Sequence, residues 1–259
     1  MSVPQAAIDP LKFDARKEFS QGDRHQLWAV LRECRRGDRW EEFALARGHM
    51  HFLGMTRPPL KEDEREKILK TIDECKKRGE SGLVFMCAVA MRTLQPETHV
   101  ELSDTDWENA TGLFRARWDR QFPDVMLALS LASDMYVIDP SKSPLTAEDK
   151  LKWETLIQRN ILDSLAPQGF ATVAAAARVL GLPMNLKPED WAILHQLLAN
   201  LKASDSIDVW DKVPELAANM QILAASEVKV TDKGLEISMG RKRRDRAETP
   251  LPDALDLQK

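Results

Sequence analysis

The amino-acid sequence predicts an all-α fold: an α-solenoid-like stack of about five helical hairpins, followed by a small C-terminal β-hairpin and a flexible tail. Three observations lead to this prediction. Residues with high helix propensity dominate the 259-residue chain, which has only 11 Gly and one Tyr. Helix-start signals recur at intervals of about 41 residues. Each signal is followed by two apolar segments.

The helix-start signals share an apolar opening residue and an acid four places later. The opening residues are Phe19, Leu60, Leu102, Leu145 and Leu186. The acids are Asp23, Glu64, Asp106, Asp149 and Asp190. In three copies a hydroxyl residue stands three places before the acid, which is the capping-box spacing: Ser20, Ser103 and Thr146. An acid in the first turn also faces the positive end of the helix dipole, so we expect each signal to begin a helix.

The first helix of each copy is expected to be amphipathic. Large apolar residues stand twelve places after the opening residue: Leu31, Ile72, Phe114, Ile157 and Leu198. Apolar residues also stand eight places after it: Leu27, Ile68, Ala110, Trp153 and Leu194. Positions four apart lie on one face of a helix, so we expect all five residues at the twelfth place to be buried.

A second helix is expected after a polar break in each copy. The apolar segments that follow these breaks are residues 40–53, 83–94, 125–138, 170–180 and 209–223. The middle three are apolar almost all round, which requires neighbours on most sides of the helix. We therefore expect the second helices to line the interior.

A helix pair that recurs with this period over residues 19–223 resembles HEAT and armadillo repeats. The resemblance implies that successive hairpins bury their apolar faces against their neighbours and offer an extended surface to a partner. A compact helical bundle with hairpins of similar length is the alternative arrangement.

The sequence divides into four parts. We expect an N-terminal extension over residues 1–18 and a helical-repeat domain over residues 19–226. Residues 227–239 alternate apolar and polar side chains around Thr-Asp-Lys-Gly, which is typical of a β-hairpin with a glycine turn. Residues 240–259 contain few apolar side chains and are expected to form a basic, flexible C-terminal tail.

Composition and motifs favour a cytoplasmic protein that is not an enzyme. The 37 Lys and Arg nearly balance the 41 Asp and Glu, so the net charge of −4 gives no global attraction to nucleic acid or to a membrane. Three cysteines without a close pair fit a reducing compartment, and neither a secretory signal nor a membrane span is recognisable. We expect Cys34 and Cys75 to be small packed residues rather than reactive thiols.

We predict no catalytic, cofactor-binding or metal-binding residues. The sequence has no zinc-protease motif and no glycine-rich phosphate loop, and a spacing of two places puts His49 and His51 on different faces of a helix. An active site that assembles only in three dimensions stays open as an alternative, with no residues nominated.

The leading functional hypothesis is a scaffold or adaptor that binds another protein. Cations gather where the first helices end and could form a ridge for a partner with an acidic surface: Arg35, Arg36, Lys76, Lys77, Arg117 and Arg120. The same cations could simply complement the helix dipoles. Trp107 and Trp191 share one place in the repeat and are candidate partner contacts if they face solvent.

The alternative hypothesis is a nucleic-acid-associated protein that uses the C-terminal hairpin and the basic tail. The phosphate-binding candidates are Arg241, Lys242, Arg243, Arg244 and Arg246. The C-terminal third is also similar to the order of elements in a winged-helix domain, but the short segment between Met220 and Val228 leaves no room for a recognition helix.

Overall fold

The computed structural model describes residues 13–55, 59–120, 123–231 and 234–239. Helices make up most of these residues, and a two-stranded antiparallel sheet follows the last helix. Both the mainly helical fold and the C-terminal β-hairpin expected from the sequence are confirmed. None of the described helices combines the length and the hydropathy needed to cross a bilayer.

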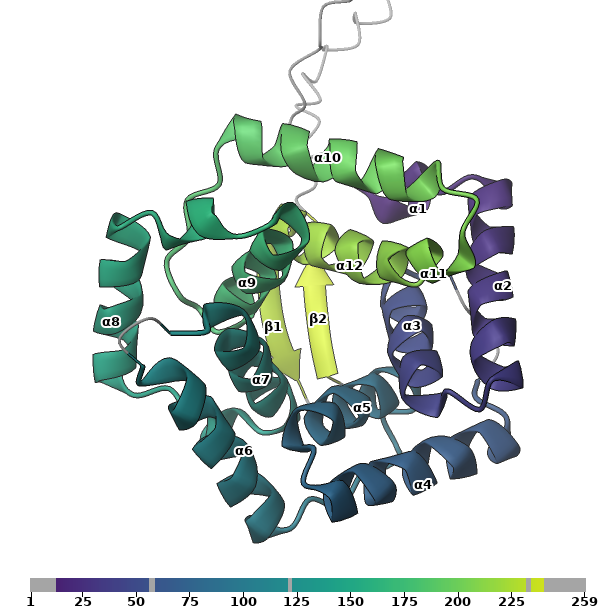
Figure 1. The fold of residues 1–259 in the computed structure, drawn as a ribbon, viewed down its shortest axis with the longest axis horizontal. Helices are drawn as coiled ribbons and strands as arrows, with labels where there is room; N and C mark the ends of the chain where they lie inside the picture. The colour runs from purple at the N-terminus through teal and green to yellow at the C-terminus, as the bar shows by residue number, and fades with distance from the viewer. Residues whose placement is uncertain (1–12, 56–58, 121–122, 232–233, 240–259) are drawn as a thin grey trace, which may run out of the picture.

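The described residues form five consecutive helical hairpins, each with an outer and an inner helix (Figure 1). The outer helices are α2 (Gln21–Arg36), α4 (Glu62–Arg78), α6 (Asp104–Trp118), α8 (Ala147–Gln158) and α10 (Pro188–Lys202). The inner helices are α3 (Trp40–Phe52), α5 (Ser81–Leu94), α7 (Val125–Ile138), α9 (Pro167–Val179) and α12 (Lys212–Ala224). Short helices are α1 (Ala15–Glu18), α11 (Ile207–Trp210), η2 (Pro140–Lys142) and η3 (Ile161–Ser164).

The hairpins close into a ring. The inner helices pack in the order α3, α5, α7, α9, α12, and α12 then packs against α3. In Figure 1 the outer helices form a pentagon around them. An open stack would leave apolar flanks on its first and last hairpins, whereas here those two flanks cover each other. The sequence left open whether the hairpins stack in an open row or close into a bundle, and in the structure they close around a common centre.

The expected helix starts are confirmed, and the expected burial at the twelfth place is confirmed for four of the five residues. Ser20 shows the capping box in full: its Oγ accepts from the backbone N–H of Asp23 at 3.1 Å, and its own N–H donates to the Asp23 carboxylate at 2.8 Å. The same reciprocal pair is present at Ser103 and Thr146. Of the five residues at the twelfth place, Ile157 is half-buried and the other four are buried.

Four of the five capping acids also join their outer helix to the one before it in the ring. A cation at the end of the preceding outer helix pairs with the acid in the first turn of the next. The N–O distances are 3.0 Å for Arg35–Glu64, 3.6 Å for Lys76–Asp106, 2.8 Å for Arg115–Asp149 and 2.9 Å for Lys202–Asp23. We call these four pairs the outer-helix clamps. The Lys202–Asp23 clamp closes the ring, because it joins the last outer helix to the first.

The junction between α8 and α10 uses a different contact. The indole Nε1 of Trp153 donates to the carbonyl of Pro183, in the segment that leads into α10, at 3.0 Å. Trp153 is fully buried and Pro183 is exposed, so this bond is partly shielded from water.

The segment before α2 also takes part in ring closure. The backbone N–H of Ala15 donates to Oε1 of Gln221 in α12 at 2.8 Å, and Phe13 packs edge-on against His195 of α10. Phe13, Ala15 and Gln221 are buried. Residues 13–18, which the sequence placed in an N-terminal extension, therefore pack on the last hairpin.

The β-hairpin covers one end of the ring. Strand β1 (Glu227–Thr231) pairs with β2 (Gly234–Ser238) from Glu227↔Ser238 to Thr231↔Gly234, and both strands are visible through the ring centre in Figure 1. Arg92, in the last turn of α5, donates from Nη2 to the carbonyl of Thr231 at 2.8 Å and from Nη1 to the carbonyl of Ile138. The hairpin is thus held over the carboxyl ends of α5 and α7.

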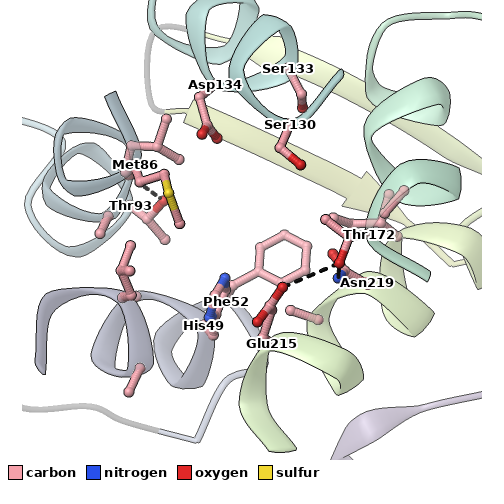
Figure 2. A pocket seen from close by; sticks show the side chains of 18 of the residues that line it. His49, Phe52, Met86, Thr93, Ser130, Ser133, Asp134, Thr172, Glu215 and Asn219 are labelled. Carbon is pink, nitrogen blue, oxygen red and sulfur yellow. Dashed lines mark hydrogen bonds between the residues drawn. The ribbon is translucent and has the colours of Figure 1, made fainter. Parts of the chain in front are cut away.

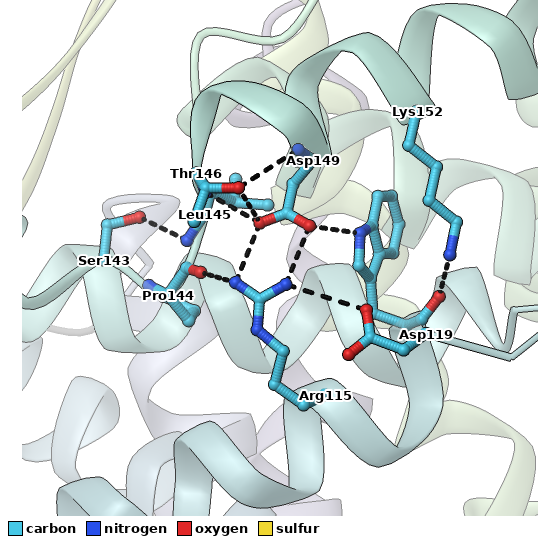
Figure 3. Close-up of polar contacts among 9 residues, drawn as sticks. Arg115, Asp119, Ser143, Pro144, Leu145, Thr146, Asp149 and Lys152 are labelled. Atoms are coloured by element: carbon cyan, nitrogen blue, oxygen red, sulfur yellow. Dashed lines mark hydrogen bonds and ion pairs between the residues drawn. The ribbon is translucent and has the colours of Figure 1, made fainter.

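The Arg115–Asp149 clamp is the most completely bonded of the four (Figure 3). Both terminal nitrogens of Arg115 donate to Asp149 at 2.8 Å, and Trp118 Nε1 and the N–H of Thr146 donate at 2.8 and 2.7 Å. Burial alone would raise the pKa of Asp149, but the bonds from Arg115 and Thr146 outweigh it and hold the pKa at about 2. The carboxylate therefore stays ionised although it is buried.

The first prediction concerns this clamp. The substitution Arg115→Ala should lower the free energy of unfolding by about 2–3 kcal/mol, because it leaves the buried Asp149 charge without its main partner. The control is Arg159→Ala, since Arg159 is exposed at the end of the following outer helix, and this change should cost less than about 0.5 kcal/mol. Urea unfolding at neutral pH, followed by circular dichroism, measures both values. Equal losses in the two variants would show that the clamp does not stabilise the ring.

Candidate functional site

The centre of the ring encloses a cavity of about 440 Å³. All five inner helices line it, and Leu235 of β2 contributes from the hairpin side. Known ligand pockets have volumes of about 300–1,000 Å³, so this cavity has the size of a small-molecule site.

The two ends of the cavity differ. The hairpin contacts α5, α7 and α9 and closes the end where Arg92 and Ile138 lie. Glu42, Gln168 and Lys212 line the other end, from the first turns of α3, α9 and α12. Large apolar side chains are exposed near the start of α5 and α7: Met86, Met126 and Leu127. The cavity therefore has a hairpin floor and a mouth at the amino ends of the inner helices.

The wall of the cavity is mainly apolar. It includes Phe52 of α3, Val89 of α5 and Val137 of α7. On α9 it includes Ala175 and Ala176, which belong to a run of four alanines. Five helices packed in a ring leave a gap on the axis, and alanine side chains are too short to fill it. This explains why the inner helices are apolar on faces that do not touch the outer helices.

A small set of polar side chains projects into this apolar space (Figure 2). The members are His49 on α3, Ser130, Ser133 and Asp134 on α7, Thr172 on α9, and Glu215 and Asn219 on α12. Thr172 Oγ1 lies 3.2 Å from Glu215 Oε1 and accepts from Asn219 Nδ2 at 3.3 Å. The single hydroxyl proton of Thr172 is shared between Glu215 and the carbonyl of Gln168, which lies 3.1 Å away.

Asp134 lies across the cavity from Glu215 (Figure 2) and has no hydrogen bond or ion pair with another described residue. Asp134 is half-buried, and it lines the cavity. Burial raises the pKa of Asp134 to about 8, and the charge of Glu215 adds to the effect. At neutral pH this carboxyl group therefore holds its proton most of the time.

His49 lies beside Glu215 in Figure 2. Burial lowers the pKa of His49 below its usual value, although the charge of Glu215 acts in the opposite direction. The imidazole is therefore neutral at physiological pH and offers one nitrogen as an acceptor.

Acids outnumber bases around the cavity. The acidic lining residues are Glu42, Asp134, Asp211 and Glu215, against Lys212 and the neutral His49. Lys212 is exposed at the mouth. Within the described residues, no three His, Cys, Asp or Glu side chains converge closely enough to hold a metal ion.

The cations predicted to bind a partner lie on the outside of the ring. Arg35 and Lys76 belong to the outer-helix clamps, as described above. Arg36 pairs with Glu33 at 2.5 Å and Arg117 with Asp124 at 3.7 Å. Arg120 donates to the carbonyl of Ala116, and Lys77 is exposed. The repeat therefore places cations at one edge, but the neighbouring acids neutralise several of them.

The two tryptophans are core residues. Trp107 is 9% exposed and packs edge-on against Phe85 with ring centroids 4.8 Å apart, and Trp191 is 2% exposed. Their proposed contact with a partner depended on solvent exposure, and this condition is not met. The basic candidates Arg241, Lys242, Arg243, Arg244 and Arg246 lie outside the described residues.

The three cysteines are buried and unpaired. Burial raises the pKa of Cys34 and of Cys75, and it raises the pKa of Cys87 to about 12. The thiolate, which is the reactive form, is therefore disfavoured at all three positions.

Sequence reasoning did not find the cavity residues. One signal was present: Asp134 is the only formally charged residue in the apolar segment 125–138. The same segment also contains the polar residues Ser130 and Ser133. A carboxyl group in an otherwise apolar helix either has a buried partner or faces a site. His49 and Glu215 lie in helices with other polar residues, so they gave no comparable signal.

The second prediction follows from the environment of Asp134. Between pH 3.8 and about 8 the unfolded chain releases a proton that the folded protein keeps, so stability falls as pH rises through this range. Asp134→Asn should therefore raise the free energy of unfolding by an amount that grows with pH and reaches about 5 kcal/mol near pH 8. Thermal unfolding between pH 5 and pH 9 measures the difference. A constant difference over this range would contradict the raised pKa.

Comparisons with models of protein families, with curated proteins and with solved structures found no match to this chain.

Proposed function

We propose that this protein binds a small molecule in the central cavity of its helical ring. The observation that carries the proposal is the cavity itself, which has an apolar wall and a few convergent polar groups. This combination characterises ligand sites in proteins, where apolar contact supplies affinity and the polar groups fix orientation.

The polar groups themselves support a binding role. A carboxyl group that faces a cavity without a partner costs stability, as the raised pKa of Asp134 indicates. An alanine or leucine at the same position would pack without this cost. Residues that lower stability in this way are common at functional sites, because a ligand supplies the missing partner.

The mouth suits a ligand with apolar surface. Met86 lines the cavity and is 37% exposed, and Met126 and Leu127 lie near the same end on α7. Methionine side chains are flexible and adapt to differently shaped ligands. The size of the cavity restricts the ligand to compact molecules.

The scaffold function expected from the sequence has less support from the geometry. An extended concave face would need an open stack, and the basic ridge would need unpaired cations. The closed ring has a central cavity in place of a concave face. Two cations of the basic ridge, Arg35 and Lys76, are already paired in the outer-helix clamps.

The third prediction tests binding in the cavity. A set of compact aromatic fragments with neutral, cationic and anionic members should contain at least one that binds saturably, as measured by ligand-detected NMR. Ser130→Phe places a large side chain in the cavity and should weaken this binding by about tenfold or more.

The matched control is Ala116→Phe, because Ala116 is exposed on the outer helix α6. This variant should bind as the unmodified protein does, and circular dichroism should show that both variants keep their helices. If no fragment binds saturably, or if the two variants weaken binding equally, the cavity is not the binding site.

A further inference from the structure

We propose, on the basis of the function proposed above, that the ligand is a compact organic cation: a protonated amine with an apolar body, whose ammonium group lies between Asp134 and Glu215. Figure 2 shows these two side chains on opposite sides of the cavity, from α7 and α12. The apolar wall would then hold the rest of the ligand.

Carboxyl groups face the cavity from two sides. A carboxylate only accepts hydrogen bonds, and Glu215 offers one to the cavity, while Asp134 offers a second once it has lost its proton. The hydroxyl groups of Ser130 and Ser133 and the neutral imidazole of His49 can each accept as well as donate. An ammonium group has only donors, so it is complementary to both carboxylates and can also donate to these neutral groups.

Charged groups face Asp134 from the neighbouring elements. Helix α12 contributes Glu215, Asp211 and Lys212. Helix α3 contributes His49 and Glu42, and the Glu42 carboxylate is paired with Arg39 at 2.6 Å. The lining residues of α2, α5, α9 and β2 carry no charge. Arg92 and Arg178 lie near the floor but do not line the cavity, since their guanidinium groups donate to the carbonyls of Ile138, Thr231 and Ala225.

The balance of these charges is negative inside the cavity. In the absence of a ligand, a proton on Asp134 relieves the repulsion between this carboxyl group and Glu215. An ammonium group between the two side chains would relieve it more completely, because its charge attracts both carboxylates. The cation therefore takes the place of the proton, which leaves Asp134 for the solvent when the ligand binds.

An aromatic ring in the cavity wall also favours a cation. Phe52 lies beside His49 and Glu215 in Figure 2. The face of a phenyl ring attracts a cation within about 6 Å, and the attraction is larger in a site from which water is excluded. A metal ion is a poorer match, because the acidic and imidazole groups of the described residues do not converge on one point.

The fourth prediction tests the charge of the ligand with three probes that share one apolar body: 4-phenylbutylammonium, 4-phenylbutanol and 4-phenylbutanoate. Isothermal titration calorimetry at pH 7 should show that the ammonium compound binds about tenfold or more tightly than the alcohol, and that the carboxylate binds most weakly. Titrations in two buffers with different heats of ionisation should show that a proton is released on binding.

The pH dependence gives an independent readout. The affinity for 4-phenylbutylammonium should rise between pH 6 and pH 8, because Asp134 loses its proton over this range while the amine, with a pKa of about 10, stays charged. Asp134→Asn should abolish this rise and the proton release, and it should reduce the preference for the cation, which Glu215 alone then supports. The matched control is Asp73→Asn, because Asp73 is exposed on the outer helix α4, and it should change none of the three.

The outcomes separate the two proposals. If 4-phenylbutanol binds as tightly as the amine, or if the amine binds without pH dependence or proton release, the inference about the cation is overturned and the cavity remains a ligand site. If 4-phenylbutanoate binds more tightly than the amine, the inference about the cation is likewise overturned. If none of the three probes binds saturably, both proposals are overturned. Retained binding of the alcohol by Asp134→Asn shows that this variant still folds.

Discussion

The ion pair between the end of one outer helix and the capping acid of the next is the interaction on which the ring depends. Four of the five capping acids have two tasks: each accepts from the N–H of its own cap residue, and each pairs with a cation at the end of the outer helix before it in the ring. This fixes both the start of a helix and the direction of its predecessor. The clamp between Lys202 and Asp23 uses the same pairing to join the last repeat to the first, so closure needs no new type of contact.

Closure of the ring determines what kind of site the protein can have. The outer faces of the inner helices pack against the outer helices, and their inner faces meet at an axis that small side chains do not fill. The polar residues on this axis oppose packing rather than support it, since Asp134 and Glu215 repel each other. A ring that served only as a structural element would have apolar residues at these positions. The cavity and its charged side chains therefore both favour a ligand site.

The parts of the fold that depend on local pattern could be predicted from the sequence. Capping spacing and the positions of Leu31 and Phe114 located the outer helices, and alternation around the turn before Gly234 located the β-hairpin. Ring closure depends on the small rotation between successive hairpins and on pairs such as Lys202–Asp23, which no local window contains. The cations and acids of the clamps recur with the same period in the sequence, so their pairing could have been predicted from it. His49 and Glu215 meet only in three dimensions.

The contact between Ala15 and Gln221 joins positions that are 206 residues apart. A ribosome releases the last hairpin only after the other four have been made, so the first hairpin must wait with one apolar flank uncovered. The cavity does not exist until this late step is complete. The cavity therefore forms in the same step in which the ring closes. A chain that ends before α12 forms neither the closed ring nor the cavity.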